Sequence, residues 1–106
     1  MTIVMKEHYM EDFGKIVQSH RRQKNWAVRT FIDLLGEDLS PAYITKIEIH
    51  GEIPSPQLIC KIAEVLGLDQ QDLLAKAKEE KVKSFGALLD KKYQTAISLY
   101  RLQKEK

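Results

Sequence analysis

The chain has 106 residues, the length of one ordinary domain, and 43% of them are hydrophobic, which is enough to bury a core. Its net charge of +2 does not mark the whole chain as a nucleic-acid binder. No apolar run reaches the ~20 residues of a membrane span, and the lone Cys60 cannot form an internal disulfide or a multi-cysteine metal site. The first ten residues lack the apolar run of a secretory signal, so we expect a cytoplasmic protein without membrane association.

Apolar residues recur with helical spacing along nearly the whole chain, which predicts an all-α fold. Residues 1–10 form either an arm or a short extra element. A first helix should begin near residues 11–12 and end near residues 24–25. Its inner face carries Phe13, Ile16, Val17 and His20. A second helix should run from about residue 27 to residue 35 and end at Gly36.

The clearest helix starts are Ser40–Pro41 and Ser55–Pro56. A serine can cap the first backbone N–H groups, and proline suits the first helical position. We therefore predict a third helix from Ser40 to Gly51 and a fourth from Ser55 to Gly67. Asp69 should cap a fifth helix.

Residues 76–83 are almost all charged and form either a solvated helical extension or a linker. After them, with Ser84 as a cap, another amphipathic helix should run to about residue 104. Its apolar stripe is expected to form a homodimer interface or to bind a small antagonist protein; alternatively, the helix folds back on its own domain. The residues assigned to dimerisation are Phe85, Leu88, Leu89, Tyr93, Ile97 and Tyr100.

Two short helices joined by a turn in the middle of the chain have the layout of a helix-turn-helix. The stretch LSPAYITKIEIHGEIPSPQLICKIAEVLGLDQQDLL, residues 39–74, resembles the Cro/C1-type (XRE-like) helix-turn-helix domains of repressors. This resemblance implies a five-helix lambda-repressor-like domain over residues 11–75, followed by a C-terminal helical extension over residues 76–106. It also implies a transcriptional regulator, a repressor in this family, that binds double-stranded DNA as a dimer at the nucleoid and needs no cofactor.

The resemblance places the third helix in the major groove, where outward side chains of its first half read bases. With the isoleucines of this helix turned inward, the base-reading candidates are Ala42, Tyr43, Thr45 and Lys46. Tyr43 either contacts the groove or packs under the fourth helix. Five basic residues and no acidic one lie within residues 15–29, which favours phosphate contacts there. The phosphate candidates are Arg22, Lys24, Arg29, Ser40, His50 and Ser55.

In similar domains an arginine of the first helix pairs with the glutamate at the end of the recognition helix. The matching residues are Arg21 and Glu48, which we expect to form a structural pair that orients the helix. We expect Trp26 to close the core between the first two helices.

Some positions depart from the family pattern. Val28 stands where the family has a DNA-contacting glutamine, Ile32 stands where it has alanine, and Glu37 and Asp38 lengthen the turn. These departures favour a rival function, a protein-interaction module that kept the fold and lost DNA binding. The sequence contains no nucleophile–base arrangement, no glycine-rich phosphate loop and no metal-ligand spacing of its histidines, so we predict neither an enzyme nor a metalloprotein.

Overall fold

The computed structural model describes residues 11–104. Residues 1–10, where the sequence allows an arm or a short element, and residues 105–106 lie outside the described part. Within residues 11–104 the chain forms five helices and no strand, which confirms the predicted all-α class. These are α2 (Phe13–Gln23), α3 (Val28–Leu35), α4 (Pro41–Ile49), α5 (Pro56–Leu66) and α6 (Gln70–Lys104).

Side-chain caps set the starts of four helices. The Asp12 carboxylate accepts the Lys15 N–H at 2.8 Å, and the Ser40 hydroxyl accepts the Tyr43 N–H at 3.1 Å. Ser55 and Asp69 cap α5 and α6 in the same way. A capped start satisfies backbone donors that have no partner within the helix, so these four helices begin where the sequence predicts.

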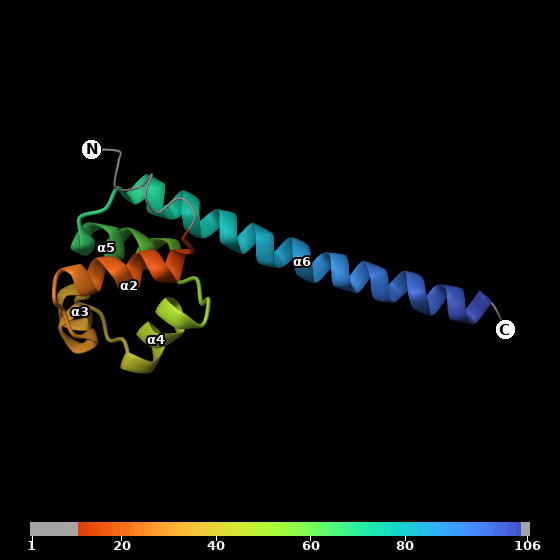
Figure 1. The fold of residues 1–106 in the computed structure, drawn as a ribbon, viewed down its shortest axis with the longest axis horizontal. Coiled ribbons are helices and arrows are strands. Elements are labelled where there is room, and N and C mark those ends of the chain that lie inside the picture. The colour runs from red at the N-terminus through yellow and green to blue at the C-terminus, as the bar shows by residue number, and fades with distance from the viewer. Residues whose placement is uncertain (1–10, 105–106) are drawn as a thin grey trace.

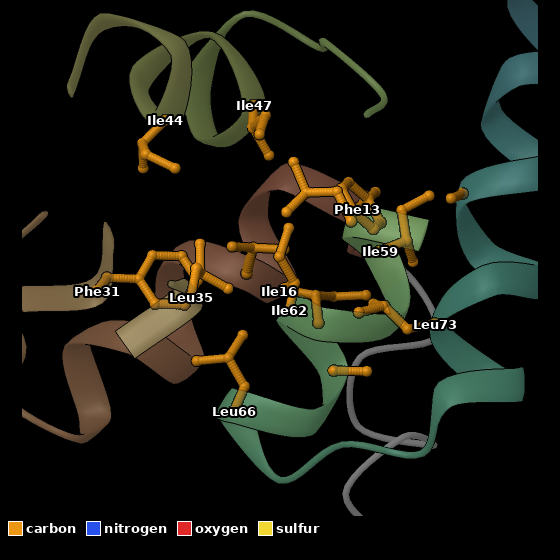
Figure 2. Packing of buried hydrophobic residues seen from close by; sticks show 14 of the residues in the cluster. Phe13, Ile16, Phe31, Leu35, Ile44, Ile47, Ile59, Ile62, Leu66 and Leu73 are labelled. Carbon is orange, nitrogen blue, oxygen red and sulfur yellow. The ribbon is translucent and has the colours of Figure 1, made fainter. Parts of the chain in front are cut away.

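The core lies where α2, α3, α4, α5 and the beginning of α6 meet (Figure 2). Figure 2 shows apolar side chains of all five helices pointing into this space, among them Phe13, Phe31 and Leu73. His20 is also buried, as expected for a histidine on the apolar face of its helix. We call α2–α5 together with residues 70–80 of α6 the head.

The fifth helix and the C-terminal helix, predicted as separate elements, are one continuous 35-residue helix, α6. Residues 76–83 are therefore a helical extension and not a linker, and Ser84 lies inside the helix instead of capping it. The physical reason is composition: lysine, glutamate and alanine all favour helix, and this segment has no proline or glycine that would stop one.

The distal part of α6 projects away from the head in Figure 1 and gives the molecule a long axis of 63 Å. It does not fold back on its own domain, because its large apolar side chains are exposed. Among the described residues, no helix combines the length and apolar character needed to cross a membrane.

Candidate nucleic-acid interface

The outer face of α4 is open to solvent. Ala42, Thr45 and Lys46 are exposed, while Ile44 and Ile47 on the opposite face are only 1% exposed. The two isoleucines point into the core beneath α4 (Figure 2). The Thr45 hydroxyl donates to the Pro41 carbonyl at 3.2 Å, which turns its hydroxyl toward the helix backbone. Helix α4 can thus approach a ligand with the outer face of its first half uncovered.

A buried ion pair holds α4 against α2. Arg21 donates from Nε to one Glu48 oxygen at 2.7 Å and from Nη2 to the other at 3.0 Å, so the pair is bidentate. Its side chains are 9% and 3% exposed. The hydrogen bond to Glu48 raises the pKa of Arg21 above its ordinary value, although burial opposes this, so the guanidinium stays charged.

Arg21 also fixes the turn between α2 and α3. Its Nη1 donates to the Trp26 carbonyl at 2.6 Å, so one guanidinium joins three elements of the head. Trp26 itself is half-buried and stacks on Phe31, with ring centroids 6.5 Å apart. It closes the core at this corner, as predicted.

Gly14, which sequence reasoning missed, sets how closely α2 approaches α4. A Cβ added at Gly14 would meet the Ile47 carbonyl oxygen, and it would lie 2.8 Å from the Glu48 carbonyl oxygen. Both obstacles are backbone atoms, which cannot swing aside. A glycine within a helical pattern is the sequence signal that could have indicated this close approach.

Glu80 of α6 is a second feature that the sequence did not reveal. Its carboxylate accepts the N–H of Phe13, the first residue of α2, and so ties α6 to the start of α2. Burial raises the pKa of Glu80 from its ordinary value of 4.5, and the Phe13 N–H opposes this rise. No local pattern could predict a cap from 67 residues away.

Tyr43 lies at the edge of the α4 face. It is half-buried: part of its side chain packs against the core, and the rest is open to solvent. Burial raises the pKa of its hydroxyl, and the charge of Glu52 adds to this rise. The Tyr43 hydroxyl therefore stays protonated and can donate a hydrogen bond at neutral pH.

The phosphate candidates are all exposed. Arg22 and Lys24 lie at the end of α2, and Lys24 Nζ lies 5.5 Å from the centre of the Trp26 ring. Arg29 is the second residue of α3, a helix whose start has no side-chain cap. Ser40 and Ser55 cap their helices, so each hydroxyl is already an acceptor for a backbone N–H. His50 caps the end of α4 through its backbone.

Two positions that depart from the Cro/C1-type pattern pack in the core. Val28 is half-buried and packs against the core, and Ile32 is buried. Leu39 anchors the turn between α3 and α4 by packing against the core. Glu37 and Asp38 are exposed in that turn, which places acidic groups beside the start of α4.

The residues assigned to dimerisation all lie on the distal part of α6. All of them are exposed except Leu89, which is half-buried. They lie on the part of the helix that projects beyond the head, so the base-reading and dimerisation candidates occupy separate parts of the molecule (Figure 1).

No family model, curated protein or solved structure matches this chain. Within residues 11–104, no group of three or more histidine, cysteine, aspartate or glutamate side chains could hold a metal ion.

Proposed function

We propose that the protein is a sequence-specific regulator of transcription, a repressor of the Cro/C1-type, that binds double-stranded DNA as a dimer in the cytoplasm. Helix α4 enters the major groove, and α6 carries the contacts between subunits. The observation that carries this proposal is the exposed outer face of α4. The buried pair Arg21–Glu48 holds this helix against α2.

The side chains of this face suit base recognition. Lys46 can donate to the O6 and N7 acceptors of guanine, and the methyl groups of Thr45 and Ala42 can contact a thymine methyl. Ala42 is small enough to let the start of α4 come close to the floor of the groove. Tyr43 supplies a protonated hydroxyl at the edge of the same face.

Basic residues outside α4 suit contacts with phosphates. Arg22, Lys24 and Arg29 lie around the junction of α2 and α3, and Arg29 stands beside the backbone N–H groups at the start of α3. A helix start with free N–H groups favours an anion. These contacts position the protein on a duplex without reading its sequence.

The test begins with selection of bound duplexes from a random pool, using the full chain. We expect a two-fold symmetric consensus, because a symmetric dimer binds two half-sites. If Arg22, Lys24 and Arg29 of both subunits contact phosphates, log affinity should fall with log salt with a slope of roughly −5.

Substitution of the reading helix refines the test. Lys46→Ala should weaken binding to the selected duplex by at least about 30-fold, because a lost base contact typically costs about 1–3 kcal/mol in each of the two subunits. Lys83→Ala removes the same charge from an exposed site on α6 and is the matched control, with affinity close to the unsubstituted protein.

The absence of any enriched sequence, together with no salt-dependent binding to any duplex, would refute DNA recognition. That result would favour the protein-interaction module. Val28, which packs against the core, and the exposed acids Glu37 and Asp38 are the features that support this rival.

A further inference from the structure

The distal part of α6 has an apolar face that no described residue of the chain covers. Val82, Phe85 and Leu99 on this face are between 56 and 62% exposed. Two series recur every seven residues: Val82, Leu89 and Ala96 form one, and Phe85, Lys92 and Leu99 form the other, three positions later. This is the a and d pattern of a helix that pairs with another helix.

The pattern lies to one side of the residues that α6 buries in the head. Leu73 and Ala77, on the proximal part of α6, are buried in the core. At 3.6 residues per turn, Val82, Phe85 and Leu89 point to a different side of the helix from those two residues. The face is thus free to receive a partner while α6 stays attached to the head.

We propose that this face pairs with the same face of a second copy of the chain, with the two α6 helices antiparallel and crossing between Asp90 and Lys91. This register deepens the dimer of the proposed function and rests on it, but it does not depend on DNA recognition. In this register each layer joins one residue of each copy. The three kinds of layer, each present twice, are Val82 with Leu99, Phe85 with Ala96, and Leu89 with Lys92.

Side-chain size favours this register over a parallel one. The largest side chain of the seam, Phe85, faces the smallest, Ala96, so the layers can be filled evenly. In a parallel pair in register, Phe85 would face its own copy and Ala96 would face alanine, which leaves one crowded layer and one cavity.

Charge favours the same orientation. Residues 81–104 contain six basic residues and one acidic residue, so parallel helices would align like charges and set the two Lys92 side chains against each other in one layer. In the antiparallel pair the methylene stem of Lys92 covers Leu89, and its ammonium group reaches water.

An open apolar groove on the head lies beside this face. Its volume is about 420 Å³, and it is lined by Lys81 and by Val82, a residue of the face. The proposed register brings Leu102 of the second copy next to Lys81, which lines the groove. The groove wall is formed by Ile53, Pro54, Ile59 and Leu74.

The dimensions also fit a stable dimer. Exposed apolar side chains occur from Val82 to Leu102, so two α6 helices can stay in contact over about 30 Å. At 1.5 Å per residue, the two heads lie about 40 Å apart along the paired helices, which is of the same order as the 34–36 Å between half-sites.

The test exchanges the two residues of one layer in the full chain. Phe85→Ala leaves a cavity, and Ala96→Phe crowds the layer, so each should raise the dimer Kd by about 100-fold in sedimentation equilibrium. The double variant restores a phenylalanine opposite an alanine, and its Kd should return to within about tenfold of the unsubstituted protein.

Two results would overturn the proposal. One is a double variant whose loss equals the product of the single losses, as expected if positions 85 and 96 do not face each other. The other is an unsubstituted chain that stays monomeric at about 100 µM, which would point to a different occupant such as an antagonist protein. All these measurements are made without DNA, so they stand apart from the test of DNA recognition.

Discussion

At the residue scale, Arg21 is the side chain on which the orientation of α4 most depends. Arg21→Ala leaves the Glu48 carboxylate buried without its charged partner, which typically costs about 3–5 kcal/mol. For a head of this size we therefore expect the melting temperature to fall by more than about 10 °C.

The neighbouring residue supplies the matched control for Arg21. Arg22→Ala removes the same side chain from an exposed site and should change stability by less than about 0.5 kcal/mol, while it weakens DNA binding. Thermal denaturation followed by circular dichroism measures both variants. Equal melting temperatures for Arg21→Ala and the unsubstituted protein would contradict the role of the pair.

Glu80 gives a prediction about pH. Because its pKa is raised in the folded state, its contribution to stability is complete below the ordinary value of 4.5 and is lost as pH rises through the folded-state pKa. Glu80→Gln keeps an acceptor for the Phe13 N–H but cannot ionise. The stability of this variant relative to the unsubstituted protein should therefore be greater at about pH 7 than at about pH 4.

Urea titrations at the two pH values check this difference. Asp90→Asn removes one carboxylate from an exposed part of α6 and is the matched control at both pH values. A difference for Glu80→Gln that does not change with pH would show that the Glu80 carboxyl titrates alike in the folded and unfolded chain.

At the scale of the elements, the contact between α2 and α4 decides how the reading helix is presented. Gly14→Ala places a Cβ against the backbone carbonyls of Ile47 and Glu48, so the two helices must separate. We expect a loss of at least about 2 kcal/mol in urea denaturation, in the range of overpacked cores.

A second glycine shows whether helix propensity alone matters. An added Cβ at Gly86 meets nothing within 4 Å, so Gly86→Ala in the middle of α6 should stabilise the chain by about 0.5–1 kcal/mol. If Gly14→Ala were also stabilising, the close approach of α2 and α4 would not be a constraint on the fold.

At the scale of the whole molecule, α6 belongs to both parts of the protein. Ala77 is buried in the head and Glu80 caps α2, so the head needs α6 at least as far as Glu80. A chain that ends at Lys83 should therefore unfold cooperatively but sediment as a monomer.

The same truncated chain tests the contribution of the dimer to DNA binding. Because two linked heads bind two half-sites with a high effective concentration, the truncation should lower affinity for a two-fold symmetric duplex by about 10²- to 10⁴-fold. Binding to a single half-site should change little. A truncated chain that remains dimeric would place the subunit contacts in the head.

Local sequence was enough to predict the helix starts and the inner faces, because a cap and an apolar period are local properties. Ser40, Ser55 and Asp69 cap helices where predicted, and Ile44 and Ile47 lie on the buried side of α4. Tertiary structure decided the rest. Three features belong here: the continuity of α6, the close approach at Gly14 and the cap from Glu80. Each depends on contacts between elements far apart in the chain, and a local pattern does not encode such contacts.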